Sequence, residues 1–384
     1  MSHRWAALAA LCALTAVAAG AVAWWRQHLA AQQRRPAAAE VAPPAERFAD
    51  YLRAQTGVAV TAELLLPLAE ATTAALEERM DAVARQLAPD AADWRPLFAL
   101  LLRDHPASEA AVLAAYRREV DRAEAFVRER RLVTLPAGGV EVEPLVNPIM
   151  RRAFPFAVYL DGGRLAVTLR PAPAAAPVAG YLANHCRVCI PPLAVHETYP
   201  GHHVAFAAAP HPRRAGLRRN LVFHEGWALY GELLMLEHGY WQGQPELELA
   251  ALRMLQLRAV RAAVDAALAT GALGTHAAAE RYRQGLLLTP QAAASELHEH
   301  LRLPGRKATY LVGALQILTL RRQVAAEGGG ALAGFHDRLL TAERPLPEVA
   351  ATLFAVALEP LDQAPPLLPT TPLALRAPLA AAQP

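Results

Sequence analysis

The spacing of apolar residues is the feature that most restricts this chain, because it predicts helices over most of its length. Within residues 63–87 and 108–132, apolar side chains recur every three or four positions with charged residues between them, the pattern of an amphipathic helix. Residues 190–360 show the same periodicity. Alanine supplies much of the 54% hydrophobic content of the 384 residues, and alanine is the best helix former. The predicted fold class is therefore mainly α.

One short region alternates instead of following the helical period. Residues 140–143, 154–160 and 165–169 place apolar side chains at every second position, which is typical of strands. Asp161-Gly162-Gly163 stands between the last two and predicts a hairpin turn. We therefore expect a small β-sheet (a minor α+β component) within the helical body.

The N-terminus carries a candidate membrane segment. Residues 5–25 are 21 positions without a charge, bracketed by Arg4 and Arg26, and a bilayer core needs roughly 20 apolar residues in a helix. A cleaved secretory signal ending at Ala21-Val22-Ala23 is the alternative. We expect an uncleaved transmembrane anchor with the body exported to the periplasmic side of the inner membrane. The arginines that follow residue 25 favour the opposite orientation on the positive-inside rule.

Composition excludes several classes of protein. The net charge of +3 is small and the basic residues are scattered, so we expect no nucleic-acid partner. Three cysteines are too few for a disulfide scaffold. Cys186 and Cys189 fit a redox pair, half of a metal site or a local disulfide; we favour the disulfide, which is the argument for export.

The predicted organisation has five parts. They are an anchor or signal over residues 1–25, a linker over 26–45, an N-terminal helical region over 46–135, a main domain over 136–363 and a Pro/Ala-rich tail over 364–384.

The chemistry is concentrated in two blocks, residues 196–203 (HETYPGHH) and 224–230 (HEGWALY). A hydrolytic zinc site needs three protein ligands, an open position and a carboxylate beside the water. The usual helical solution has a second histidine four positions after the first, but Pro200 occupies that place after His196. His202 and His203 are the next candidates. Six residues along a helix rise roughly 9 Å, so the rings converge more easily if Pro200 bends the helix.

The third ligand is expected from the second block. Glu225 lies in an otherwise apolar stretch, where a buried carboxylate needs a cation. Glu232 is seven positions further on the same helix face, and we expect it to support a ligand.

These blocks resemble the bacterial "domain of unknown function 885" family, which is similar to zinc metallopeptidases. His196-Glu197-x-x-Pro200-Gly201-His202-His203 matches its first signature, and residues 225–232 (EGWALYGE) match its second. Residues 117–136, 258–265 and 303–321 also resemble it. Asp265 is followed by alanines, whereas the family has Thr-Gly-x-His at this place.

The resemblance implies a multi-helical, zincin-like metallopeptidase body with one Zn²⁺ per chain. Its metal ligands would be His196, His202 and Glu225, since Gly201-His202 aligns with a Gly-His pair in thermolysin-like helical peptidases. Glu197 would be the general base. Tyr310, or secondly His203, would stabilise the oxyanion.

Some interpretations stay open. Tyr310 also fits a tyrosine packed in the core. Arg258 and Arg261 fit binding of a peptide carboxylate, but a solvated helix face or an ion pair with Asp265 is favoured. The function predicted is a membrane-tethered metallopeptidase acting on peptides. A metal-dependent amidase or esterase, or a non-catalytic metal-binding scaffold, is the alternative.

Overall fold

Helices dominate the computed structural model, which describes residues 44–169, 182–208, 220–328 and 330–368. The α-helices are α2 (Pro44–Thr56), α3 (Ala62–Leu87), α4 (Arg95–Leu101), α5 (Glu109–Arg130), α6 (Pro148–Ala153), α8 (Ile190–Glu197), α9 (His202–Ala208), α10 (Leu221–Glu237), α11 (Pro245–Thr270), α12 (Thr275–Glu280), α13 (Pro290–Arg302), α14 (Thr309–Ala326), α15 (Leu332–Leu340) and α16 (Leu346–Val349). Short 3₁₀ or π turns lie at Ala183–His185, Arg281–Gly285, Ala350–Phe354 and Leu361–Gln363. The predicted mainly helical class is confirmed.

Two long helices show how the sequence sets their ends. The Thr61 hydroxyl accepts a hydrogen bond from Leu64 N at the start of α3, and the Ser108 hydroxyl does the same for Ala111 N at the start of α5. Arg131 ends α5 in the left-handed conformation, at φ 51°. The helices predicted over residues 63–87 and 108–132 therefore form within two residues of the expected bounds.

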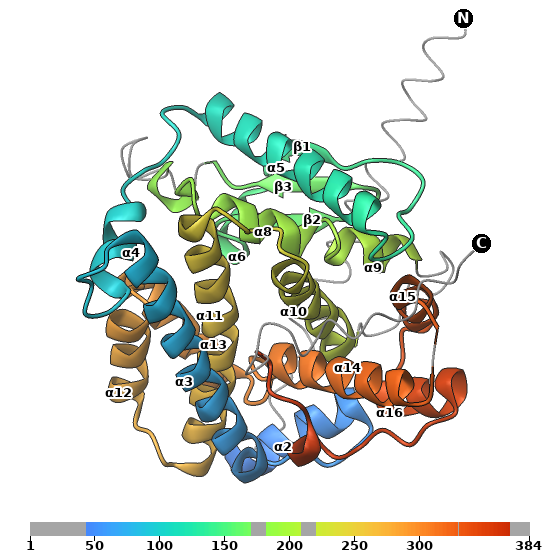
Figure 1. The fold of residues 1–384 in the computed structure, drawn as a ribbon. Helices are drawn as coiled ribbons and strands as arrows, with labels where there is room; N and C mark the ends of the chain where they lie inside the picture. Colours follow the sequence, from blue (N-terminus) through green and yellow to red (C-terminus); the bar gives the residue numbers. More distant parts are fainter. Residues whose placement is uncertain (1–43, 170–181, 209–219, 329, 369–384) are drawn as a thin grey trace, which may run out of the picture. The chain divides into compact units, whose positions relative to one another are not determined.

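Two or three strands are predicted, and three form, in one sheet of order β1-β3-β2. The strands are β1 (Glu141–Pro144), β2 (Ala157–Leu160) and β3 (Arg164–Val167). β3 pairs antiparallel with β2 through the predicted hairpin at residues 161–163 and parallel with β1. Figure 1 shows the sheet between α5 and α8, and β2 is the edge strand that contacts α8, the helix that carries His196.

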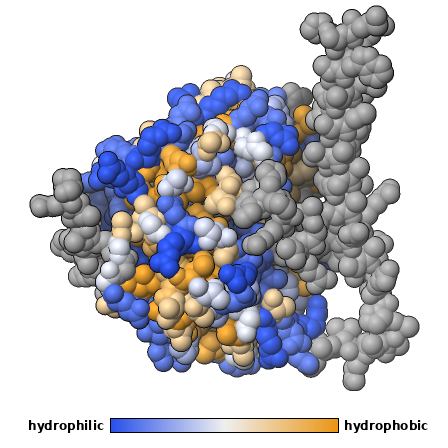
Figure 2. Space-filling model, turned by 90° about the vertical axis from the view of Figure 1, so that its right-hand side faces the viewer, coloured by the Kyte–Doolittle hydropathy of each residue, from blue (hydrophilic) through white to orange (hydrophobic). Residues whose placement is uncertain are grey.

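Helix packing brings the second block into the core. α10 crosses α14 where two glycines meet: a Cβ on Gly226 would lie 2.5 Å from Gly313 Cα. α11 packs along α3, and α10 packs along α14 (Figure 1). The side that Figure 2 presents carries apolar areas among hydrophilic residues, as the surfaces of folded proteins do.

The predicted terminal parts lie mostly outside the described residues. Residues 5–25, most of the linker and residues 369–384 are among these. α2 already begins at Pro44, within the predicted linker, and Leu367, within the predicted tail, packs in the core. None of the described helices has the length and apolar character of a membrane span. The border predicted at residue 135 stays a prediction.

Candidate metal centre

The first block forms two helices and not one bent helix. His196 and Glu197 are the last residues of α8, and His202 opens α9. Between them the chain turns, with a cis peptide bond joining Tyr199 and Pro200. A Cβ on Gly201 would lie 1.9 Å from the carbonyl oxygen of His196, so only glycine lets the two helix ends approach this closely.

α10 fixes this turn. The indole Nε1 of Trp227 donates hydrogen bonds to the carbonyl oxygens of Pro200, at 2.8 Å, and Gly201, at 3.2 Å. Trp227 is fully buried. The second block therefore holds the first block in place, in addition to supplying Glu225.

Three predicted ligands converge. The imidazole rings of His196 and His202 lie 4.8 Å apart between centroids. Glu225 Oε2 lies 3.6 Å from His196 Nε2 and 3.5 Å from His202 Nε2. Ligand atoms that share one tetrahedral zinc at about 2.0–2.1 Å lie roughly 3.3–3.4 Å apart. The two distances from Glu225 to the histidine nitrogens are therefore close to those expected for ligands of a single ion.

Glu197 lies at the same centre. Its carboxylate and ring nitrogens of His196 and His202 lie within 4.8 Å of one another. Glu197 Oε2 accepts a hydrogen bond from the backbone N–H of Tyr159 at 2.8 Å. The edge of β2 thus holds this carboxylate beside the histidines.

The charges of the centre call for a cation. Three carboxylates, those of Glu197, Glu225 and Glu232, lie around the two histidines, and one guanidinium, that of Arg258, pairs with Glu232. When both histidines are neutral, as they must be to bind a metal, these groups sum to two negative charges in a largely buried volume, and burying unbalanced charge is costly. A divalent cation would balance them, so the donor set fits such an ion in charge as well as in spacing.

Glu232 orients His196. Its Oε1 lies 2.7 Å from His196 Nδ1 and 3.2 Å from Arg258 Nη2, so that Nε2 of His196 faces Glu225. A carboxylate behind a ligating histidine fixes the tautomer and strengthens the ligand. The support predicted for Glu232 is therefore seen in the contacts.

Protons and a metal ion compete for this cluster. Burial and Arg258 lower the pKa of His196, but Glu225 and Glu232 act more strongly and raise it to about 9. Burial opposes the charged form of Glu225, yet its hydrogen bonds to His196 and His202 hold its pKa well below the usual value. His196 therefore carries a proton at neutral pH when no metal is bound.

The two adjacent histidines have different surroundings. His203 Nδ1 lies 3.1 Å from the Tyr159 hydroxyl, and its ring packs edge-on against Tyr199 with centroids 4.9 Å apart. Burial lowers the pKa of His203, which keeps the ring neutral. The structure thus brings His202 to Glu225 and His203 to Tyr159. A histidine that shares one metal ion with His196 and Glu225 has to lie beside Glu225. The contacts place His202 there, and they place His203 against Tyr159.

Tyr310 lies beside the centre, in the first turn of α14. Its ring is nearly parallel to that of His196, with centroids 6.4 Å apart. Burial and the charge of Glu225 raise the pKa of Tyr310, so its hydroxyl keeps its proton. Within the described part of the chain this hydroxyl makes no hydrogen bond, so Tyr310 keeps a free donor.

The favoured interpretation of the two arginines is wrong. Arg258 is 3% exposed and lies against Glu232, and Arg261 binds Glu296 through two hydrogen bonds of 2.9 and 2.5 Å. Asp265 pairs instead with His300, at 3.1 Å. Neither arginine forms a solvated face, because each meets a carboxylate from another helix.

Two further features complete the site. Tyr159 contacts both Glu197 and His203. The sequence did not predict this role, because no local pattern indicates which residue of a strand contacts a helix. Cys186 and Cys189 form the predicted disulfide just before α8.

Solved structures share this fold. A "putative lipoprotein" from Colwellia psychrerythraea matches 80% of this chain and 54% of its own length, with TM-score 0.69 and 21% identity. A "putative lipoprotein of unknown function" from Shewanella oneidensis matches 87% of this chain and 64% of its own length, with TM-score 0.69 and 18% identity. The chain thus spans less than two thirds of either protein.

The comparison with curated proteins finds no match. The family described as "Bacterial protein of unknown function (DUF885)" matches residues 3–346, which include both histidine blocks, the sheet and α14. The chain therefore belongs to the DUF885 family.

Proposed function

We propose that this protein is a metal-dependent peptide hydrolase with one Zn²⁺ per chain, held by His196, His202 and Glu225. The observation that carries the proposal is the approach of two imidazole nitrogens, from two helices, to within 3.6 Å of one oxygen of Glu225. Two nitrogens and one carboxylate oxygen form the donor set of hydrolytic zinc sites that keep a fourth position open.

Three residues around the centre have separate roles in the proposed reaction. A bound divalent cation would supply Lewis-acid polarisation and a lowered pKa for water. Glu197 accepts a proton from the attacking water and passes it to the leaving amine, while Tyr159 N–H holds one of its oxygens in place. Tyr310 donates a hydrogen bond from its hydroxyl to the negative charge that develops on the substrate carbonyl oxygen, and keeps its proton.

The proposal includes a location. The similar solved proteins are described as putative lipoproteins, residues 5–25 are long enough for an anchor, and Cys186 and Cys189 are joined. The first two favour a body tethered to the membrane, and the disulfide favours its export to the periplasmic side.

The test compares wild type with Glu197→Gln on a mixed peptide library, with zinc content measured for both. We expect one zinc per chain in each protein and a loss of cleavage of about 100-fold or more in the variant. One zinc per chain without hydrolysis by either protein would leave a metal-binding scaffold. Hydrolysis of non-peptide amides or esters without peptide cleavage would favour that alternative substrate class.

A further inference from the structure

Lys307 is the single lysine of the chain, beside 37 arginines. It precedes α14, three positions before Tyr310. Its ammonium Nζ lies 3.1 Å from Glu296 Oε2, and its side chain is 14% exposed. A lysine presents a compact primary ammonium in place of the planar fork of an arginine.

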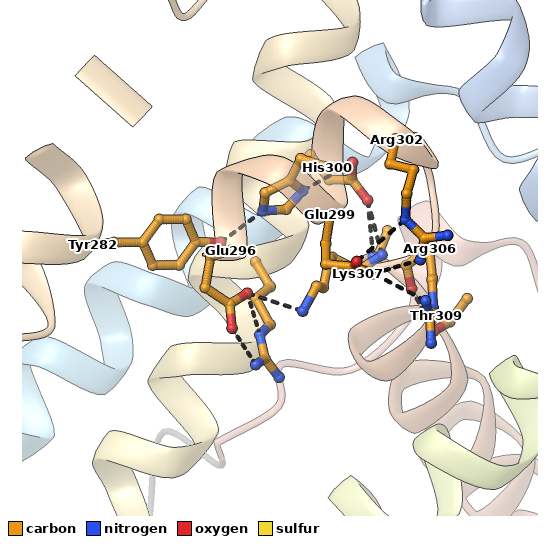
Figure 3. A network of polar contacts seen from close by, with 11 residues as sticks. Tyr282, Glu296, Glu299, His300, Arg302, Arg306, Lys307 and Thr309 are labelled. Carbon is orange, nitrogen blue, oxygen red and sulfur yellow. Dashed lines mark hydrogen bonds and ion pairs between the residues drawn. The ribbon is translucent and has the colours of Figure 1, made fainter. Parts of the chain in front are cut away.

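Lys307 shares its carboxylate partner, Glu296, with another cation. Glu296 also accepts two hydrogen bonds from Arg261. The neighbouring Glu299 forms ion pairs with both Arg302 and Arg306. Figure 3 shows Glu296 and Glu299 side by side on α13, facing the turn that carries Lys307 and Arg306. Four cations therefore meet two carboxylates.

The nearest further acid, Asp265, forms no ion pair with Lys307 or Arg261 within the described part of the chain. Asp265 pairs with His300, and its other oxygen accepts hydrogen bonds from the backbone N–H groups of Lys307 and Ala308. Burial and Arg261 lower the pKa of Lys307 to about 8, although Glu296 acts in the opposite direction. Lys307 and Arg261 are 14% and 15% exposed and share Glu296, so a further anion placed between them would be favourably paired.

This pair of cations lies close to the metal centre. The Arg261 guanidinium is 5.5 Å from the centre of the Tyr310 ring, which is 6.4 Å from the His196 ring. Taken end to end, the two distances put the guanidinium no more than about 12 Å from that histidine. An extended peptide advances about 3.3–3.6 Å per residue, so up to three residues fit between.

We propose that Lys307 and Arg261 form the subsite for the free C-terminal carboxylate of a peptide substrate. This assignment rests on the proposed hydrolysis of peptides and specifies it: the enzyme cuts one to three residues from a free C-terminus. Asp265 is a positioning residue for this subsite, because it holds the backbone on which Lys307 and Tyr310 stand.

The first test measures binding in the zinc-loaded Glu197→Gln protein. The probes are the labelled pentapeptide Ala-Ala-Phe-Ala-Ala with a free C-terminus and its C-terminal amide, followed by fluorescence anisotropy. We expect the acid to bind at least 10-fold more tightly than the amide. Adding Lys307→Gln should reduce this ratio to about 3-fold or less and leave the affinity for the amide unchanged, whereas Lys307→Arg should restore part of it.

A matched control and a second readout separate the subsite from a purely structural role. Arg79→Gln removes another ion-paired cation, partnered by Glu248, and should leave the ratio unchanged. Because Lys307 is the only lysine, amine acylation at pH 8 followed by mass spectrometry reports on it alone among side chains. The acid peptide should protect Lys307 from acylation and the amide should not.

The outcomes distinguish the two proposals. Equal affinities for acid and amide, or no binding of either, would overturn the carboxylate subsite, and so would cleavage of acid and amide at the same internal bonds. In that last case peptide hydrolysis still stands. Discrimination without any cleavage by the wild type would keep the subsite and reject the hydrolase.

Discussion

Glu232→Gln tests how far the carboxylate behind His196 sets metal affinity. The substitution keeps the shape of the side chain and an acceptor oxygen, but it removes a negative charge 2.7 Å from His196 Nδ1 and 3.2 Å from Arg258. Losing such a partner of a ligating histidine lowers metal affinity by about 10-fold to 100-fold, or about 1.4–2.7 kcal/mol. Arg258, left without its partner, adds unfavourable charge beside the ion.

The same helix offers a matched control. Glu237 is also buried on α10, and it pairs with Arg321 at 2.8 Å. Glu237→Gln therefore removes a largely buried ion pair that does not support a predicted ligand. We expect both variants to be destabilised, and only Glu232→Gln to lose zinc affinity.

The assay is a competition titration with a chromophoric zinc chelator, run on metal-free wild type and both variants at one pH. Affinities within about 2-fold of wild type for Glu232→Gln would refute the reasoning. An equal loss in Glu237→Gln would also refute it, because the effect would then follow general destabilisation.

Three further predictions concern the proton, the oxyanion donor and the helix crossing. Zinc binding at pH 7.5 should release about one proton from His196, whose pKa is raised from 6.5 to about 9; calorimetry in two buffers of different ionisation enthalpy measures it, and no release would contradict the assignment. Because this pKa is raised on folding, its stabilisation of the metal-free protein is present below pH 6.5 and lost as pH rises through 9. Tyr310→Phe should lower peptide hydrolysis by about 100-fold with zinc affinity unchanged, whereas an unchanged rate would restrict Tyr310 to packing. Gly226→Ala should lower the free energy of unfolding by about 1–3 kcal/mol because of the contact with Gly313, and Gly334→Ala, which meets open space, should not.

Local signals predicted much of the helical fold. The cap at Ser108, the apolar period of residues 63–87 and the turn at residues 161–163 each act within a few positions, and the corresponding elements form as expected. The pairing of β1 with β3 depends on the whole chain and could not be predicted from alternation alone.

The site could be predicted in its residue types and only partly in its geometry. His196, His202 and Glu225 meet as expected, but they do so because the chain turns at Gly201 and α9 begins again beside α8. A bent continuous helix was the simplest prediction from Pro200, and the close approach at Gly201 is a tertiary contact that sequence spacing does not reveal.

The arginines show the same limit. Arg261 lies 35 positions from Glu296, and Arg258 lies on a different helix from Glu232, so no local pattern indicates these pairs. Lys307 is different, since a single lysine among 37 arginines is visible in the composition and was a signal available from the sequence.

Zinc titration of two adjacent histidine variants tests the central claim most directly. His202→Asn and His203→Asn change neighbouring, buried imidazoles of α9, but only His202 faces Glu225, at 3.5 Å. We predict one tight zinc site per chain in wild type and in His203→Asn, and its loss in His202→Asn. Tight binding retained by His202→Asn, or lost in His203→Asn alone, would contradict the assignment of the metal centre.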